Sequence, residues 1–161
     1  MDHRIVSAKE ENREEILSLY QAQKGRPYCP WDEDYPSDAT ISFDLARGAL
    51  FVLKSGGRIK AAVSIDEDET VAQLLCWDKA LEPSAELARL AVAPEEQNKG
   101  LGRVMLRFGM DELKRRGFKG VHFLVNKHNV TALRSYAVFG FHVVGECRLY
   151  GQDFLCCEKE L

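Results

Sequence analysis

The sequence predicts an α/β protein in which a mixed sheet of about seven strands carries helices on both faces. Two apolar stretches, residues 49–65 and 141–161, have the pattern of hairpins. Between them, strand-like and helix-like segments alternate, which favours strand–helix–strand crossovers. The 161 residues are 45% hydrophobic and 29% charged, so the chain can bury a core without disulfides or metal. We expect residues 1–161 to form a single domain.

The N-terminal elements follow from their periodicity. Residues 3–9 alternate like a strand, and residues 11–23 have the apolar stripe of a helix. Residues 24–38 hold three prolines and should be irregular. A short helix should begin near Ser37 or Asp38 and end at Gly48.

The middle of the chain contains one ambiguous segment. The hairpin of residues 49–65 should turn at Ser55-Gly56-Gly57. Residues 66–85 are harder to interpret, and their centre, VAQLLCW, is compatible with a strand. Residues 86–94 should form a strand that ends at Pro94.

The C-terminal half predicts two helices and three strands. A helix over residues 101–117 should bury one face and end at Gly117; that face carries Leu101, Val104, Met105, Phe108 and Leu113. Residues 119–127 should be a strand. Asn129 is a candidate N-cap for a helix that ends at Gly140, and two closing strands should meet at Gly151-Gln152.

Composition excludes several classes of protein. The net charge of −3 does not favour nucleic acid, and the sequence contains no apolar run long enough for a membrane span. The first residues lack the apolar stretch of a signal peptide, so we expect a cytoplasmic protein. The five cysteines form no CxxC motif, and neither they nor the four histidines have metal-binding spacing. We therefore expect reduced thiols and no metal.

The loop QNKGLG, residues 97–102, lies between an apolar strand and a helix. It does not match GxxxxGK[ST], and Met105 stands where the third glycine of GxGxxG belongs. Backbone amides at a helix N-terminus still favour an anion, and Lys99, Arg103 and Arg107 add positive charge. From the loop alone, a turn that needs glycine only for its shape is an equal alternative.

Two motifs in order resemble those of the GNAT superfamily of N-acetyltransferases. RLAVAPEEQNKGLGRVML resembles its acetyl-CoA-binding segment, Arg/Gln-x-x-Gly-x-Gly/Ala after a strand, through Gln97, Gly100 and Gly102. NVTALRSYAVFGF resembles its Asn-x-x-Ala-x-x-x-Tyr-x-x-x-Gly-Phe helix through Asn129, Ala132, Tyr136, Gly140 and Phe141. The resemblance covers residues 86–161 well and the N-terminal half by element order only. It implies a GNAT-like fold with acetyl-CoA as cosubstrate.

The resemblance also implies how the cosubstrate binds. Strand residues before the loop would pair with the pantetheine amides: Leu90, Ala91 and Val92. The loop amides and the first helical turn would hold the pyrophosphate: Gln97, Asn98, Lys99, Gly100, Leu101, Gly102 and Arg103. Asn129 would contact the pantetheine arm or shape its pocket.

Acetyl transfer to an amine needs a base, a polarised carbonyl and a proton for the leaving thiolate. As base we favour Glu86, because a comparable glutamate occurs in histone-type family members; a solvent-facing Glu86 is the alternative. The rival carboxylates are Asp78, Asp32, Glu33 and Asp34. As acid we favour Tyr136, against the alternative of a core aromatic. The Val92 backbone N–H would polarise the carbonyl, and attack would be direct, within a ternary complex.

The acceptor should be met by residues 27–38 and by a second wall around residues 76–78. Asp32 and its acidic neighbours would attract a cationic amine, with Trp31 and Tyr35 packing on its carbon body. Cys76 and Trp77 would form the opposite wall. The alternative is that the aromatics pin a long loop to the core while the acids are solvated.

The sequence therefore predicts an N-acetyltransferase that moves acetyl from acetyl-CoA to a primary amine of a small molecule or a peptide N-terminus. A non-catalytic acyl-CoA-binding module, or a regulatory partner of another enzyme, is the first alternative; an NAD- or ATP-binding protein is the second. The identity of the amine, acetyl against a longer acyl donor, and a homodimer against a monomer all stay open.

Overall fold

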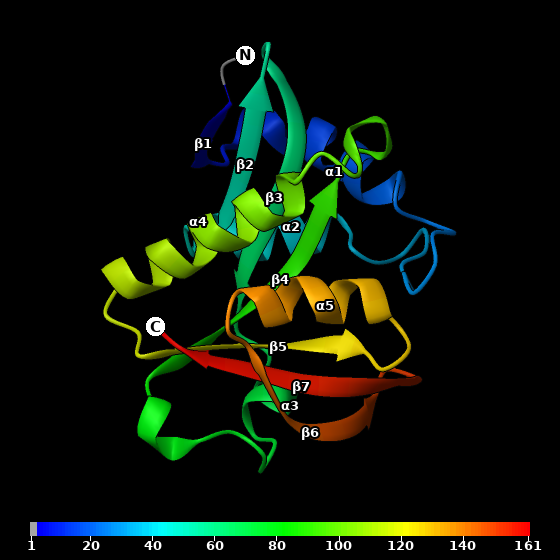
Figure 1. The fold of residues 1–161 in the computed structure, drawn as a ribbon. Helices are drawn as coiled ribbons and strands as arrows, with labels where there is room; N and C mark the ends of the chain where they lie inside the picture. Colours follow the sequence, from blue (N-terminus) through cyan, green and yellow to red (C-terminus); the bar gives the residue numbers. More distant parts are fainter. Residues whose placement is uncertain (1–2) are drawn as a thin grey trace. The chain divides into compact units, whose positions relative to one another are not determined.

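The computed structural model of the protein describes residues 3–161. Over these residues, seven strands form one sheet in the order β1-β2-β3-β4-β5-β7-β6 (Figure 1). β4 pairs with β5 in parallel, whereas β1–β2, β2–β3, β5–β7 and β6–β7 are antiparallel. The predicted mixed sheet of about seven strands is confirmed.

The chain folds into two compact units. The first comprises the described residues up to Asp66 together with Ala88–Gly109, and the second comprises Glu67–Leu87 and Met110–Leu161. Two elements run through both units: β4 (Ser84–Val92) and α4 (Leu101–Arg115). The strand that carries the predicted base and the helix that follows the glycine loop are thus shared.

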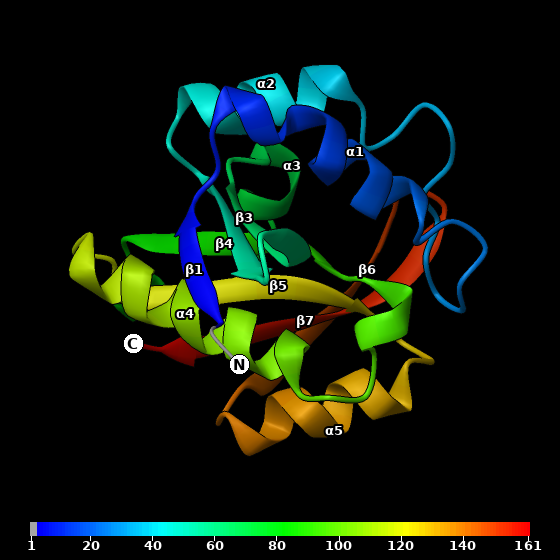
Figure 2. The ribbon, with the colours of Figure 1, turned by 90° about the horizontal axis from the view of Figure 1, so that it is seen from above.

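The first unit contains three antiparallel strands, β1 to β3. Its elements are β1 (Arg4–Ser7), η1 (Glu10–Asn12), α1 (Arg13–Gln21), α2 (Asp38–Ala46), β2 (Leu50–Ser55), β3 (Arg58–Asp66) and η3 (Pro94–Glu96). Figure 2 shows α1 and α2 on one side of β1–β3 and α4 on the other. Phe51 of β2 meets Phe108 of α4, with ring centroids 5.1 Å apart. Helices therefore cover both faces of this part of the sheet.

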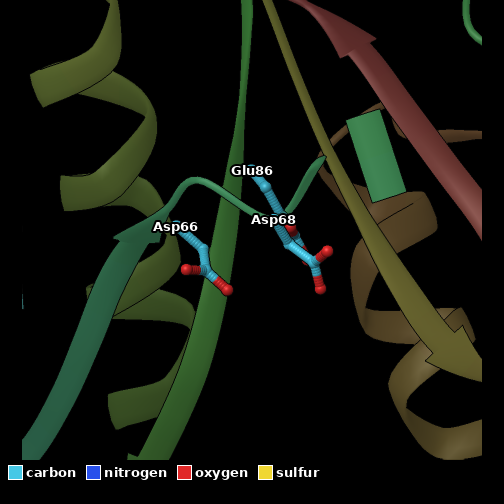
Figure 3. A group of neighbouring side chains, drawn as sticks. All are labelled: Asp66, Asp68 and Glu86. Atoms are coloured by element: carbon cyan, nitrogen blue, oxygen red, sulfur yellow. The ribbon is translucent and has the colours of Figure 1, made fainter. Parts of the chain in front are cut away.

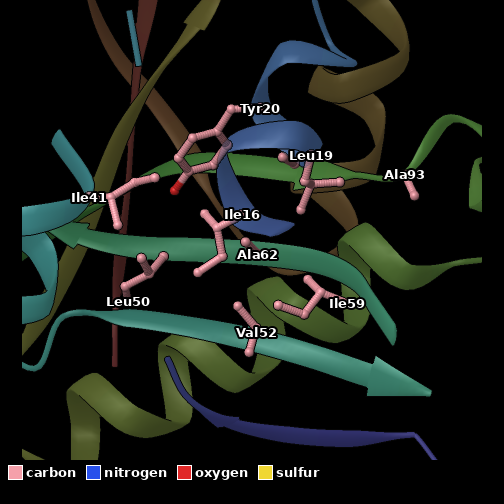
Figure 4. Packing of buried hydrophobic residues seen from close by; sticks show 10 residues of the cluster. Ile16, Leu19, Tyr20, Ile41, Leu50, Val52, Ile59, Ala62 and Ala93 are labelled. Carbon is pink, nitrogen blue, oxygen red and sulfur yellow. The ribbon is translucent and has the colours of Figure 1, made fainter. Parts of the chain in front are cut away.

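The core of the first unit lies between α1, α2 and the strands. Ile16, Ile41 and Val52 are fully buried, and Figure 4 shows them among other apolar side chains. The burial of each such side chain contributes about 1.5–3 kcal/mol relative to exposure. The predicted limits of α2 are confirmed, because the Ser37 side chain accepts a hydrogen bond from the Thr40 amide and Gly48 has a φ of +62°.

The second unit contains the closing strands. Its elements are α3 (Glu69–Ala72), η2 (Lys79–Leu81), β5 (Gly120–Asn126), α5 (Val130–Val138), β6 (His142–Leu149) and β7 (Gln152–Glu160). α5 lies along one face of β5 and β7 (Figures 1 and 2), and Phe123 of β5 meets Tyr136 of α5 with ring centroids 4.7 Å apart. His122 precedes Phe123 and faces the opposite side of the sheet. Its ring stacks on Trp77, with the ring centroids 4.6 Å apart.

The structure decides one ambiguous segment and contradicts one expectation about local structure. VAQLLCW is not a strand: the Asp68 side chain accepts hydrogen bonds from the amides of Thr70 and Val71, which starts the short helix α3 instead. Val104 was expected on the buried face of α4 but is 41% exposed. The buried stripe runs through Met105, Leu106 and Met110, and Val104 lies one step outside it.

The cysteines are all free thiols, and Cys156 and Cys157 on β7 are both buried. Within residues 3–161, no helix is long and apolar enough to cross a membrane.

His122 makes the second unit sensitive to acid. It is 5% exposed, its Nδ1 lies 2.7 Å from Ser84 Oγ, and burial lowers its pKa from 6.5 to about 4. The unfolded chain takes up this proton below about pH 6.5 while the folded chain does not, so stability falls as pH drops towards 4.

Between pH 7 and pH 5, we expect His122 to account for about 2 kcal/mol of lost unfolding free energy. Urea unfolding of the wild type and of His122→Gln at both pH values measures this contribution, because the other titrating groups are common to both proteins. Equal losses in the two proteins would contradict the assignment.

Candidate active site

β4 changes its backbone conformation in mid-strand. At its start, Ser84–Glu86 pairs with Gly120–His122 of β5. Three residues later, Arg89 has a φ of +50°, a left-handed conformation that is rare for a residue other than glycine. Leu90–Val92, the residues predicted to bind pantetheine, follow directly after this kink.

The end of β4 is held by two glutamine side chains. Gln23 Nε2 and Gln97 Nε2 both donate to the carbonyl oxygen of Val92, at 2.9 Å and 2.7 Å. The side chain of Gln97 is therefore occupied in fixing the loop to the strand. What it offers a pyrophosphate is its backbone amide, which stays a prediction.

The glycine loop leads directly into α4. Asn98 and Gly100 have φ values of +62° and +83°, and α4 begins at Leu101. A Cβ atom added to Gly102 would lie 4.0 Å from Leu90 Cδ2, an ordinary contact, so this glycine is not required by local packing. Gly100 is required for its conformation, since side chains rarely adopt that φ.

The charges around the loop are partly paired. Lys99 Nζ lies 3.1 Å from Glu96, which also pairs with Lys60 at 3.0 Å. Lys99 is on the surface, so this pair is weak and can give way to another anion. Arg103 lies exposed in the first turn of α4. The helix dipole and these cations favour a negative ligand at this end of α4.

The motif helix α5 carries Asn129 and Tyr136. Asn129 is the N-cap, as predicted, and its side-chain oxygen accepts a hydrogen bond from the Ala132 amide at 3.2 Å. Tyr136 is half-buried, with Phe123 at 4.7 Å and Phe141 at 6.4 Å between ring centroids. Burial, assisted by Cys157, raises its pKa above 10. The phenol thus carries its proton at neutral pH.

Glu86 lies on β4 beside a second carboxylate. Oxygens of Glu86 and Asp68 lie within 4.8 Å of each other. Figure 3 shows these two side chains as neighbours. Asp68 accepts a 2.6 Å hydrogen bond from the Tyr150 hydroxyl, and this bond, with burial, raises the Tyr150 pKa to about 12. Tyr150 is a residue that sequence reasoning missed, because it lies in the hairpin turn 82 residues away from Asp68. Asp66, also drawn in Figure 3, ends β3 in the first unit.

The loop between α1 and α2 is fixed by its own side chains. Trp31 packs edge-on against the core residue Tyr20, with centroids 5.4 Å apart. Asp32 Oδ1 accepts hydrogen bonds from the amides of Asp34 and Tyr35. Glu33 forms an exposed pair with Lys24 at 3.6 Å. Trp31 thus packs this loop against the core, as the alternative expected. The Asp32 carboxylate stabilises the turn, and its role in binding an acceptor stays a prediction.

The predicted second wall lies in the second unit. Trp77 Nε1 donates to the Val71 carbonyl at 2.8 Å, and its ring stacks on His122. Cys76 packs closely against β6. A Cβ atom added to Gly145 of that strand would lie only 2.7 Å from the Cβ atom of Cys76. The rival base Asp78 caps η2 by accepting from the Ala80 amide. These contacts explain how the segment is held; its role towards an acceptor stays a prediction.

Residues 13–141 match the model of the acetyltransferase (GNAT) family. The chain belongs to the GNAT family. This confirms the resemblance drawn from the Gln97–Gly102 loop and the Asn129–Phe141 helix.

The curated relatives of this GNAT protein match it over short stretches. Mycothiol acetyltransferase of Tsukamurella paurometabola is 37% identical over 79 residues, which are 46% of this chain and 27% of that protein. [Ribosomal protein bS18]-alanine N-acetyltransferase of Escherichia coli K12 is 38% identical over 58 residues, which are 36% of this chain and 39% of that protein. The chain thus spans about a quarter to two fifths of the length of these relatives.

Solved structures are similar over nearly the whole chain. The ribosomal-protein-S18-alanine N-acetyltransferase of Escherichia coli superposes with a TM-score of 0.76 and 22% identity, over 99% of this chain and 94% of that one. An N-acetyltransferase of Thermoplasma acidophilum in complex with coenzyme A gives a TM-score of 0.74 and 18% identity over 100% of both chains. These likenesses confirm the predicted GNAT-like fold.

Proposed function

We propose that this GNAT protein is an N-acetyltransferase that moves the acetyl group of acetyl-CoA to a primary amine. The observation that carries the proposal is the kinked end of β4, followed by a loop with positive φ at Gly100 and the start of α4. Such a loop presents backbone amides and a positive helix end to an anion. Membership of the GNAT family and the similar structure solved with coenzyme A support the pyrophosphate of coenzyme A as that anion. In this proposal the two units act as one domain.

The residues divide the work of binding. The loop Gln97–Gly102 and Arg103 hold the pyrophosphate through backbone amides and charge, while Leu90–Val92 offer backbone groups to the pantetheine amides. Asn129 starts α5 and shapes the pantetheine pocket. When bound, acetyl-CoA supplies an activated thioester carbonyl.

The same residues account for the chemistry. Glu86 takes a proton from the acceptor ammonium through water, with Asp68 beside it to favour a cationic acceptor. The Val92 N–H stabilises the negative charge that develops on the carbonyl oxygen when the amine attacks. Tyr136 donates its phenol proton to the departing thiolate, since its raised pKa keeps that proton in place at neutral pH.

Relatives named for different acceptors support either a small molecule or a peptide N-terminus. The test mixes the protein with acetyl-CoA and an amine panel that contains polyamines, amino sugars and short peptides with free N-termini. Release of free thiol with at least one amine supports the transferase. Coenzyme A binding without thiol release on any amine would instead favour an acyl-CoA-binding module.

Glu86→Gln should lower kcat by about a hundredfold, the scale of general-base catalysis. The rising limb of the pH–rate profile should move to higher pH, because the acceptor must then lose its proton without help. Thiol release measured from pH 6 to pH 10 gives the profile. Asp78→Asn, at the rival carboxylate, should leave the profile unchanged. A wild-type profile for Glu86→Gln would exclude Glu86 as the base.

A further inference from the structure

Arg89 is a charged residue buried in mid-strand. It is 8% exposed and has a φ of +50°, which costs about 1 kcal/mol or more for a residue with a side chain. Such a conformation persists only where other contacts determine it. In the first unit, those contacts come from the arginine's own guanidinium group.

The guanidinium joins three other elements to β4. Nη2 and Nε donate to the Asp44 carboxylate of α2, with the shortest distance 2.9 Å. Nη1 donates to Asp66 at the end of β3 and to the hydroxyl of Tyr35, each at 3.1 Å. This fork geometry is specific to arginine, since a lysine ammonium cannot reach all three partners in one plane.

The cluster is balanced in charge. Asp44 is fully buried and also accepts from Arg47 at 2.6 Å and from Ser64 at 2.8 Å, so two arginines face the two carboxylates of Asp44 and Asp66. Burial alone would lower the pKa of Arg89, but Asp66 and Asp44 outweigh it and raise that pKa. The guanidinium therefore stays charged, and its loss would remove one of the two arginines that balance Asp44 and Asp66.

The Tyr35 contact links this cluster to the loop between α1 and α2. Tyr35 forms a backbone bridge with Asp32, whose side chain in turn caps the amides of Asp34 and Tyr35. Residues 32–35 thus form one small turn, and the Tyr35–Arg89 hydrogen bond links this turn to β4. Arg89 therefore contacts the turn through its side chain. Its backbone conformation sets the direction of the residues that follow, Leu90–Val92.

We propose that Arg89 is a positioning residue that fixes the coenzyme-binding strand Leu90–Val92 and couples it to the turn at residues 32–35, which selects the acceptor. This inference rests on the proposed function, which assigns the strand to the coenzyme, and on the predicted role of residues 32–35 in binding the amine. The proposed coupling predicts that binding of coenzyme A to the strand also changes the amide exchange of residues 32–35.

Amide hydrogen exchange, with coenzyme A as the probe, tests this coupling. In the wild type, coenzyme A should slow exchange in residues 89–93 and also in residues 32–35. Tyr35→Phe removes only the hydroxyl, and because Tyr35 is 45% exposed, water can satisfy Arg89. In this variant coenzyme A should still slow residues 89–93 but no longer residues 32–35. The control Tyr28→Phe makes the same change at an exposed position of the same loop and should behave as wild type.

Steady-state kinetics give a second test. If the Tyr35 hydroxyl only stabilised the fold, its removal would not change the KM for the amine alone. With the best amine of the panel, Tyr35→Phe should raise the KM for the amine by about fivefold or more while the KM for acetyl-CoA and the Tm stay unchanged. Wild-type exchange and an unchanged amine KM in Tyr35→Phe would overturn the inference.

The two proposals fail in different ways. If coenzyme A does not bind the wild type, the proposed function fails, and the coupling is then decided on the free protein. There, Arg89→Lys, which keeps the charge but loses the fork, should speed exchange in both segments by about tenfold. Faster exchange in residues 89–93 alone would show that Arg89 does not couple them to the turn.

Discussion

Replacing Tyr136 with phenylalanine is expected to lower kcat by about a hundredfold and to leave the affinity for coenzyme A within about twofold. The phenol proton is the one the proposal gives to the leaving thiolate, and burial keeps it on the oxygen by raising the pKa of Tyr136. Phenylalanine keeps the ring that packs on Phe123 at 4.7 Å, so the fold and the binding site should survive. Steady-state thiol release and calorimetric titration with coenzyme A measure the two quantities.

The control for this prediction is Tyr28→Phe, which removes the hydroxyl of a residue that is 50% exposed and should change neither quantity. An unchanged kcat in Tyr136→Phe would remove the acid assignment and leave Tyr136 as a core aromatic. A fall in coenzyme A affinity equal to the fall in kcat/KM would assign Tyr136 to binding rather than to proton transfer.

Gly100→Val is expected to weaken coenzyme A binding by tenfold or more, which corresponds to about 1.4 kcal/mol. Gly100 has a φ of +83°, and a β-branched side chain is strained in that conformation. A Cβ atom there would meet nothing within 4 Å, so the effect would come from the backbone and not from a clash. Calorimetric titration with coenzyme A measures it.

Gly102→Ala is the matched control within the same loop. Gly102 does not need a positive φ, and an added methyl would make only an ordinary contact with Leu90. The family pattern also admits alanine there, so affinity should stay within about threefold of the wild type. Wild-type affinity in Gly100→Val would show that the shape of this loop does not hold the coenzyme.

The sequence predicted those parts of the fold that local chemistry determines. Ser37 and Asn129 are N-caps because a side-chain oxygen can accept a helix amide, and Gly48 and Gly140 end helices because they adopt positive φ. These rules depend on a few neighbouring residues. The two motifs predicted the family because they too are local. The Gln97–Gly102 loop leads into one helix, and the Asn129–Phe141 motif begins at the N-cap of another.

What the sequence did not predict depends on partners far along the chain. In the sequence, Arg89 is a single charged residue in the apolar run LARLAVAP. Its partners Asp44 and Asp66 lie 45 and 23 residues away along the chain. A lone arginine inside an apolar strand was a signal for a buried ion pair, but it could not name the partners. The 71–77 segment stayed ambiguous because its apolar residues are also compatible with a strand. In the structure Asp68 caps α3, and Leu75, which follows that helix, is fully exposed.

The central claim is acetyl transfer from acetyl-CoA to a primary amine, and one measurement tests it most directly. The protein is incubated with a metabolite extract and acetyl-CoA whose acetyl carbons are both heavy isotopes, and the products are resolved by mass spectrometry. The account predicts at least one amine that gains the doubly labelled acetyl group with the wild type and gains far less with Tyr136→Phe. Coenzyme A bound by the protein, with no labelled amine beyond a protein-free control in either the metabolite extract or a peptide pool, would contradict it.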